Sequence, residues 1–324
     1  MKNQTVILDL FAGYGGAELS FKYADIKVDK SYISEVNPSA IKVLQKHYPD
    51  AIFVGDVRKL RAIDFIHVKY ILGGSPCQFF SFAGRRKGMV TTTNEEIYTL
   101  ERYLELKEEG FEFQGQSYLF WEFVRLYVEI TKLQRKFGLP EAKFLLENVD
   151  MEQKWQDVIS KALGVKPFVF DAAMVSAQSR VRLFWTNFFK KFELPKDKNI
   201  KIGDIIRGAV NGSGFRGRKV NGVYTYPQTI REDNKSNCLV TTLGSVVKGT
   251  GRMYGTGFYV TKNGTTKQLT VEQAEVLQGL EKGYTNVKGV SKTARIKMIG
   301  NGWSIPVTGH IMKQLKKEIL KSEK

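Results

Sequence analysis

The chain of 324 residues contains only two cysteines, and one of them has the setting of a nucleophile. Cys77 follows Pro76 in the segment Gly-Gly-Ser-Pro-Cys-Gln, directly after an apolar run that predicts a buried strand. α/β enzymes keep their active sites at the carboxyl ends of such strands, and arginines in the following loop would favour the reactive thiolate. A lone cysteine is more often a small buried apolar side chain, but the Pro-Cys turn favours a nucleophile. Cys238 lies in a polar region without such a setting, and we expect it to be structural.

Acidic, amide and basic side chains follow two later strand-like segments. Glu147 and Asn148 close the run Lys-Phe-Leu-Leu-Glu-Asn-Val, where they would share a sheet edge with Cys77. Arg180 and Arg182 are two residues apart, so in a strand they would point to one face. Either arginine could instead pair with a surface acid, and the spacing alone does not decide between these alternatives.

A glycine-rich turn after the first predicted strand indicates a nucleotide-like ligand. Residues 9–16 are Asp-Leu-Phe-Ala-Gly-Tyr-Gly-Gly, and the glycines would let the backbone approach a ligand where a helix begins. Glu35 closes the second strand, where it could accept hydrogen bonds from ribose hydroxyls, and Asp56 follows the third, near an adenine edge. Each carboxylate alone could be an ordinary helix cap, but three strand ends in register favour a cofactor. A second glycine-rich turn, residues 299–306, carries the indole of Trp303.

Strand-like and helical segments alternate over the first 188 residues, which predicts an α/β fold with a doubly wound sheet. Predicted strands cover 6–11, 31–36, 51–57, 70–76, 143–149, 168–175 and 182–188. Segments with helical spacing cover 16–24, 38–48, 117–133 and 152–164.

The composition changes after Phe188 to a segment rich in Gly, Asn, Lys and Arg, and helical patterns return near residue 269. We therefore predict a catalytic domain of residues 1–188 plus 267–324 and a smaller domain of residues 189–266. Residues 89–113, which carry many acidic side chains, are interpreted as a charged helical insertion on the solvated surface, and we assign them no chemistry.

The formal net charge of +17, from 50 Lys and Arg against 33 Asp and Glu, would attract a polyanion such as nucleic acid. A basic surface kept for solubility is the alternative. The N-terminal sequence lacks the pattern of a signal peptide, and no apolar stretch reaches bilayer length. Two distant cysteines suggest neither a disulfide framework nor a metal site. These features predict a cytoplasmic protein with no membrane partner and no metal.

Several motifs and single residues occur in a fixed order along the chain: Asp-Leu-Phe-Ala-Gly-Tyr-Gly-Gly, Glu35, Asp56, Ser-Pro-Cys-Gln, Glu-Asn-Val, Gln-Ser-Arg-Val-Arg and Gly-Asn-Gly-Trp-Ser-Ile-Pro-Val. This ordered series resembles the DNA cytosine-5 methyltransferase family. The resemblance covers nearly the whole chain outside the smaller domain. It implies a Rossmann-like sheet that binds S-adenosylmethionine and a small, mostly β or irregular, target-recognition domain. Details such as Gly-Asp-Val-Arg and the tryptophan near the C-terminus resemble the vertebrate de novo enzymes, whereas the compact smaller domain is typical of bacterial or phage enzymes.

The resemblance also implies roles for the residues at the sheet edge. Cys77 would add to carbon 6 of cytosine, Glu147 would hold the ring nitrogen in its protonated form, and Arg182 would bind the carbonyl oxygen, with Arg180 in support. Carbon 6 is stacked inside a duplex, so the target base must be flipped out of it.

Further contacts follow from the same resemblance. The expected cofactor contacts are Phe11, Gly13, Gly15, Gly16, Glu35, Val36, Asp56, Val57, Asn301, Trp303 and Ser304. The expected contacts with double-stranded DNA are Gln78, Ser81, Arg85, Arg86, Lys87, Arg207, Arg216, Arg218 and Lys219. For each basic residue of the smaller domain, a solvated surface charge is an equal alternative.

Two departures from the family pattern stand out. The insertion 89–113 lies where the catalytic loop usually leads directly into a helix, and the arginine that usually precedes the Leu269-Thr270 pair is absent. Three other functions stay open: a transfer-RNA cytosine-5 methyltransferase, a catalytically inactive regulatory homologue that binds DNA, and hydroxymethyl transfer from a folate. We further expect a monomer, with a cognate restriction endonuclease as a candidate partner and a CpG-containing target site.

Overall fold

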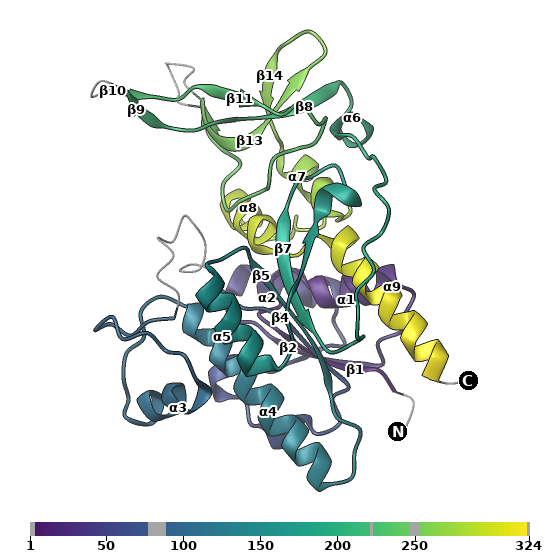
Figure 1. The fold of residues 1–324 in the computed structure, drawn as a ribbon. Helices are drawn as coiled ribbons and strands as arrows, with labels where there is room; N and C mark the ends of the chain where they lie inside the picture. The colour runs from purple at the N-terminus through teal and green to yellow at the C-terminus, as the bar shows by residue number, and fades with distance from the viewer. Residues whose placement is uncertain (1–3, 77–88, 221–222, 247–252, 323–324) are drawn as a thin grey trace.

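The computed structural model describes residues 4–76, 89–220, 223–246 and 253–322 (Figure 1). Within these residues, seven strands form one sheet in the order β3-β2-β1-β4-β5-β7-β6. The strands are β1 (Val6–Leu10), β2 (Lys30–Ser34), β3 (Ile52–Phe53), β4 (Tyr70–Gly74), β5 (Lys143–Val149), β6 (Phe168–Asp171) and β7 (Val181–Thr186). Strands β3 to β5 of this order run parallel, and β7 runs antiparallel to both β5 and β6. The predicted doubly wound α/β sheet is confirmed.

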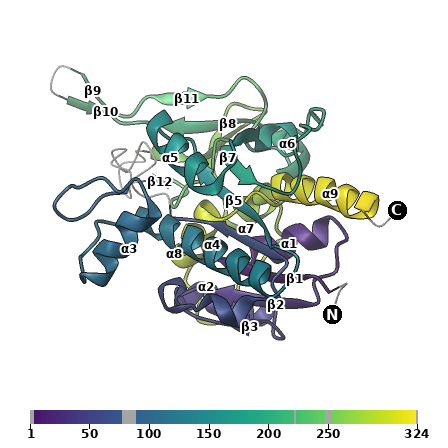
Figure 2. The same ribbon diagram turned by 60° about the horizontal axis from the view of Figure 1, so that its bottom comes forward.

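Helices cover both faces of the sheet because successive side chains of a strand point to opposite faces. Leu8 of β1 packs in the core beneath α4 and α5, whereas the adjacent Ile7 packs in the core beneath α1 and α9. Figures 1 and 2 show these two helical layers on either side of the sheet. The helices are α1 (Gly16–Tyr23), α2 (Pro38–His47), α4 (Phe120–Lys136), α5 (Gln153–Leu163), α7 (Val271–Gln278), α8 (Lys292–Asn301) and α9 (Ile305–Ser322). Short 3-10 turns are η1 (Val57–Lys59), η2 (Ala62–Phe65), η4 (Ser117–Leu119) and η5 (Ala172–Met174).

A second, smaller sheet stands on top of α7 and α8 (Figure 1). Its strands follow the order β11-β8-β13-β12, β14 pairs with β13, and β9 and β10 form a separate hairpin. Their bounds are β8 (Ala209–Phe215), β9 (Arg218–Val220), β10 (Val223–Thr225), β11 (Gln228–Ile230), β12 (Ser245–Val246), β13 (Met253–Thr261) and β14 (Thr266–Gln268), preceded by the short helix α6 (Ile202–Ile205). The last strand of this lobe ends at Gln268, two residues beyond the predicted range 189–266.

The insertion 89–113 differs from the surface feature that we expected. It contains one helix, α3 (Leu100–Glu108), as predicted, but its apolar side chains enter the main core instead of remaining solvated. Met89 and Ile97 are fully buried, and Tyr103 and Leu106 are 1% exposed. The acidic residues occupy the exposed side of a segment whose other side is apolar and buried. The interpretation of residues 89–113 as a solvated surface feature is therefore wrong.

Candidate active site

A cavity of about 890 Å³ lies at the carboxyl edge of the main sheet. The ends of β1, β2 and β4 line it from one side, and the turn after α8 closes it from the other. Of the expected cofactor residues, those lining the cavity are Phe11, Gly13, Gly16, Glu35, Val36, Asp56, Val57, Asn301 and Trp303. The structure therefore brings together residues that are nearly 300 positions apart in the chain.

Glu35 fixes the glycine-rich turn to the end of β2. One carboxylate oxygen accepts a hydrogen bond from the backbone N–H of Gly13 at 2.8 Å, and the other accepts from Val36 and Asn37 at 2.7 and 2.8 Å. The carboxylate thus has the structural role considered from sequence and also lines the cavity, where its remaining lone pairs can accept ribose hydroxyls.

Asp56 caps the first turn of η1 by accepting from the N–H of Arg58 at 3.0 Å. The Arg58 guanidinium also donates to this carboxylate, from Nε to both oxygens at 3.0 Å and from Nη2 to Oδ2 at 2.5 Å. These bonds lower the pKa of Asp56, so the side chain stays an anion and an acceptor.

The two glycine-rich turns pack directly against each other. Gly13 and Gly15 have φ angles of 58° and 89°, which are accessible to glycine at no steric cost. A Cβ on Gly16 would come within 3.3 Å of Trp303, and the Tyr14 hydroxyl donates to the carbonyl of Trp303. Trp303 itself is 6% exposed and belongs to the second core, so it both packs the interior and lines the cavity.

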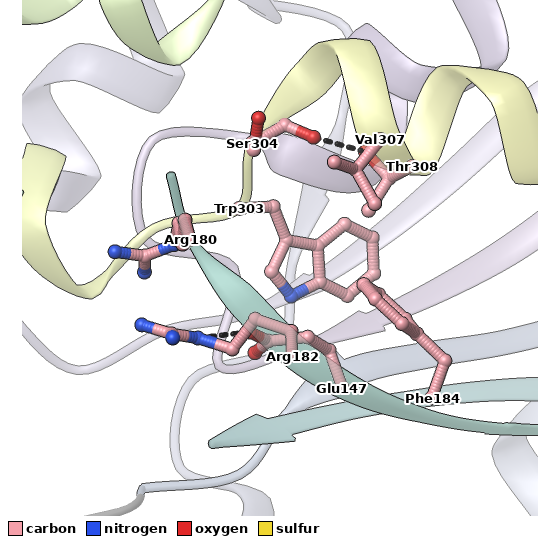
Figure 3. Close-up of a pocket in the computed structure, with 8 residues that line it drawn as sticks. All are labelled: Glu147, Arg180, Arg182, Phe184, Trp303, Ser304, Val307 and Thr308. Carbon is pink, nitrogen blue, oxygen red and sulfur yellow. Dashed lines mark hydrogen bonds and ion pairs between the residues drawn. The ribbon is translucent and has the colours of Figure 1, made fainter. Parts of the chain in front are cut away.

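Glu147, Arg182 and Trp303 form the polar end of the cavity (Figure 3). Glu147 Oε1 lies 3.0 Å from Arg182 Nε, and the Trp303 indole N–H also hydrogen-bonds to this carboxyl group. Burial raises the pKa of Glu147, against the opposing effect of the two arginines. A Cβ at Gly74 would lie 2.8 Å from the indole nitrogen and 3.0 Å from Glu147 Oε2, so only glycine leaves room here.

Backbone carbonyls hold the side chain of Arg180 in place. Its guanidinium donates to the carbonyls of Leu239, Gly300 and Gly302 at 2.9, 3.0 and 2.9 Å. The side chain therefore joins the smaller lobe to the turn that carries Trp303, and its hydrogen-bonding groups are largely used within the protein. Arg182 is the more exposed of the two, and Figure 3 shows both guanidinium groups on the same side of β7.

Asn148 and Cys238 have roles that the sequence did not reveal. The buried Asn148 amide donates to the Ser75 hydroxyl at 3.0 Å, which fixes the turn before Cys77. Cys238 was expected to lack a catalytic setting, but its Sγ lies 3.5 Å from Arg180 Nη1 and 4.0 Å from Arg182 Nη2. The contact arises because the smaller lobe folds back onto the start of β7, and the expected structural role of Cys238 stays a prediction. No local signal could have found this contact, which joins residues more than 50 positions apart.

Cys77 and the loop residues Gln78, Ser81, Arg85, Arg86 and Lys87 lie outside the described residues, so their predicted roles stay predictions. The register of β4 and β5 pairs Gly74 with Glu147, so the chain leaves β4 beside Glu147.

The remaining basic candidates lie in or beside the smaller lobe. Arg207 follows α6, Arg216 follows β8, and both are exposed. Arg218 and Lys219 belong to β9, at the outer end of the lobe in Figures 1 and 2. Gly15 and Ser304 sit next to the cavity residues, and Ser304 is 5% exposed with no hydrogen-bond partner for its hydroxyl in the described chain.

In the part of the chain that the structure describes, no group of three or more His, Cys, Asp or Glu side chains could hold a metal ion. No described helix has both the length and the apolar character needed to cross a bilayer.

The doubly wound sheet, the cavity at its carboxyl edge and the Glu147–Arg182 pair define the class of nucleotide-binding α/β enzymes. The family model of C-5 cytosine-specific DNA methylases matches residues 5–184 and 151–317. The chain therefore belongs to this family, whose members use S-adenosylmethionine.

Three comparisons illustrate the similarity. The Type II methyltransferase M.NgoBV of Neisseria gonorrhoeae is 34% identical over 32% of this chain, but the match spans only 26% of that relative. The Type II methyltransferase M1.ScrFI of Lactococcus lactis subsp. cremoris is 25% identical over 98% of this chain and 79% of that protein. The solved structure of the Entamoeba histolytica methyltransferase EhMeth has a TM-score of 0.64 at 15% identity, over 98% of this chain and 99% of that one, which shows a common fold.

Proposed function

We propose that this protein is a DNA (cytosine-5-)-methyltransferase that modifies a flipped cytosine in duplex DNA. The observation that carries the proposal is the single cavity in which Glu35 and Asp56 line one end and the Glu147–Arg182 pair lines the other. The first pair suits an adenosine and the second suits the polar edge of a pyrimidine, so a donor and a base would meet inside one cavity.

The cavity fits S-adenosylmethionine by the chemistry of its lining. Glu35 offers acceptors for ribose, the ionised Asp56 offers an acceptor for an adenine amine, and Gly16 leaves room beside Trp303. When bound, this cofactor supplies an electrophilic methyl group. The residues that would hold it are Phe11, Gly13, Gly15, Gly16, Glu35, Val36, Asp56, Val57, Asn301, Trp303 and Ser304.

The chain's own residues would activate the base. The Cys77 thiolate adds to carbon 6 and forms a C–S bond, and the ring electrons shift toward carbon 5, which then takes the methyl group. Glu147, whose pKa is raised by burial, holds a proton at the ring nitrogen, while Arg182 stabilises the carbonyl oxygen. Loss of the carbon-5 proton to water or hydroxide restores the double bond and expels the cysteine.

The surface charge supports a duplex substrate. A net charge of +17 favours phosphate binding, and the exposed Arg207 and Arg216 lie in the lobe above the cavity. Flipping the base costs a few kcal/mol, which contacts from this lobe and from residues 78–88 would offset. We further propose a cytoplasmic, bacterial or phage-encoded monomer, a cognate restriction endonuclease as partner and a CpG-containing site.

The test is transfer of labelled methyl from S-adenosylmethionine to duplex DNA by the purified protein, beside Cys77→Ala and beside transfer RNA. Label in DNA as 5-methylcytosine that disappears in Cys77→Ala is the expected result. Label in transfer RNA alone would assign the chain to the RNA-modifying alternative. DNA binding without label in either polymer would favour an inactive regulatory homologue.

A duplex that contains 5-fluorocytosine tests the role of Cys77 separately. Carbon 5 of this base carries fluorine in place of the proton that must be lost to release the cysteine. The covalent adduct therefore persists and migrates as a protein–DNA band on a denaturing gel. We expect this band for the native protein and none for Cys77→Ala. Retention of the band in Cys77→Ala would remove Cys77 from its proposed role.

A further inference from the structure

The insertion 89–113 packs against the wall of the cavity on which Asp56 lies. Its helix α3 lies beside α4 (Figure 2), and its buried side chains belong to the same core as Val57, the first residue of η1, and Leu60, which follows η1. The insertion is therefore continuous with the turn that carries one end of the cofactor cavity.

A buried carboxylate ties the insertion to α4. Glu122 of α4 is fully buried and accepts hydrogen bonds from the Tyr103 hydroxyl at 2.6 Å and from the Lys107 ammonium. Arg125, one helical turn further along, donates to the same carboxylate at 2.7 Å. A buried charge is tolerated only when it is paired and hydrogen-bonded, and here three donors, two of them from the insertion, meet that requirement.

The same cations hold the backbone of the turn after Asp56. Arg125 Nη2 donates to the carbonyls of Val57 and Leu60 at 3.3 and 3.1 Å, and Lys107 Nζ donates to that of Arg58 at 3.4 Å. Since η1 begins directly after Asp56, these bonds fix where the Asp56 carboxylate stands.

A stack of aromatic rings makes a second connection. Phe113, at the end of the insertion, lies 5.1 Å from Tyr103 and 4.5 Å from Tyr118 between ring centroids, the latter pair inclined by 21°. Tyr118 lines the cavity together with Asp56 and hydrogen-bonds to the Arg58 side chain. One face of this wall thus depends on a ring that only the insertion supplies.

We propose that residues 89–113 form part of the cofactor site, in which Lys107 and Phe113 position Asp56 and Tyr118 around the adenosine end of the ligand. This inference rests on the proposed function for the identity of the ligand. Lys107 and Phe113 are positioning residues, because neither lines the cavity. They set the affinity for adenosine-containing ligands and leave the Glu147–Arg182 end of the cavity unchanged.

The test measures binding of S-adenosylhomocysteine and of 5′-methylthioadenosine, which lacks the amino-acid part, by isothermal titration calorimetry. We expect Phe113→Ala and Lys107→Met each to weaken both ligands by the same factor, about tenfold, the ratio that loss of one such contact gives. Phe113→Tyr keeps the stack and should restore native affinity. Arg102→Ala on the solvent side of α3, where it pairs with Glu95 and Glu105, is the matched control.

Steady-state kinetics supply a readout that a general loss of stability would not give. The KM for S-adenosylmethionine should rise in Phe113→Ala while kcat and the KM for DNA stay within twofold of the native values. Native affinity for both nucleosides in Phe113→Ala and Lys107→Met would overturn the inference, as would failure of the native protein to bind either nucleoside. A native protein that binds both ligands but methylates no DNA would overturn the proposed function alone.

Discussion

Asp9 and Glu18 bring two carboxyl groups into contact beneath the glycine-rich turn. They are 2% and 5% exposed, and one oxygen of each has no hydrogen-bond partner in the described chain. Burial raises the pKa of both, and the neighbouring Glu18 and Glu35 charges raise that of Asp9 further, whereas the Ala17 N–H acts in the opposite direction. Ser31 donates to Glu18 at 2.6 Å and lowers its pKa in part.

This pair makes folding stability depend on pH in a defined direction. The pKa of Asp9 is raised in the folded state, so the folded protein keeps a proton that the unfolded chain releases above about 3.9. Stability is therefore lost as the pH rises from that value through the raised pKa. We expect Asp9→Asn to flatten this dependence and to stabilise the ligand-free protein at pH 7.5 relative to the native chain.

Urea unfolding of the ligand-free protein at pH 5.5 and pH 7.5 measures the effect. The exposed Asp64→Asn serves as the control and should leave the pH dependence as it is. An Asp9→Asn variant with the native pH dependence would contradict the assignment of the proton to this pair.

Cys238 offers a prediction at the same scale. Its Sγ accepts from Arg180, which also holds the backbone at Gly300 and Gly302, so loss of the sulfur removes one constraint on the arginines proposed to serve catalysis. We expect Cys238→Ala to lower kcat by about threefold to tenfold, in line with one weak hydrogen bond, with donor affinity unchanged. Cys238→Ser keeps an acceptor and should stay within twofold of native kcat. Equal losses of kcat in Cys238→Ala and Cys238→Ser would show that the hydrogen-bond acceptor at position 238 does not set kcat.

At the scale of elements, a close contact between α8 and the smaller lobe is the sharpest constraint. A Cβ on Gly300 would lie 2.3 Å from the backbone carbon and oxygen of Val240 and 2.6 Å from the nitrogen of Thr241. Backbone atoms cannot move aside as a flexible side chain can. The lobe can therefore approach the turn with Trp303 only because α8 carries a glycine here.

We expect Gly300→Ala to destabilise the protein by about 1–3 kcal/mol, as overpacking of a close contact does. Because the clash lies between the lobe and the cavity turn, DNA affinity should fall together with stability. Chemical denaturation and a duplex-binding titration measure the two effects, and Lys292→Ala at the exposed first residue of the same helix is the control. A stable Gly300→Ala protein with native DNA affinity would contradict the packing argument.

The elements of the main sheet could be predicted because their signals are local. Each buried strand is a short apolar run, and the strand ends carry the polar residues that meet at one edge, so Glu35, Asp56 and Glu147 were placed correctly beside one cavity. The third strand is shorter than predicted, Ile52–Phe53, because Gly55 turns the chain at a φ of 75°.

The insertion and Cys238 could not be predicted for a different reason. Their surroundings come from other segments of the chain: Tyr103 meets Glu122 of α4, and Cys238 of the smaller lobe meets Arg182 of β7. The acidic residues around Tyr103 lie on the exposed side of their segment, and the polar residues around Cys238 are typical of an exposed segment. They do not indicate which residues the buried sides contact.

At the scale of the whole molecule, the net charge of +17 should govern DNA binding. The logarithm of the binding constant for a duplex should fall linearly with the logarithm of the salt concentration. Each lost phosphate contact should reduce the magnitude of this slope by about one. We expect this reduction for Arg216→Ala and for Arg207→Ala. Lys321→Ala, at an exposed position near the end of α9, is the control and should leave the slope unchanged. Equal slopes for all three variants would mean that the DNA does not contact Arg207 or Arg216.

The cavity begins with residues 9–58 and is closed by residues 291–303, which follow the entire smaller lobe in the chain. A ribosome that adds roughly 5–20 residues per second needs tens of seconds to make the part between them. The sheet can assemble during that interval, but the growing chain has no Trp303 and therefore no complete binding site for a methyl donor. Each new molecule thus lacks a complete cofactor cavity until residues 291–303 have been made, and a chain that terminates before them would keep the sheet without the closed cavity.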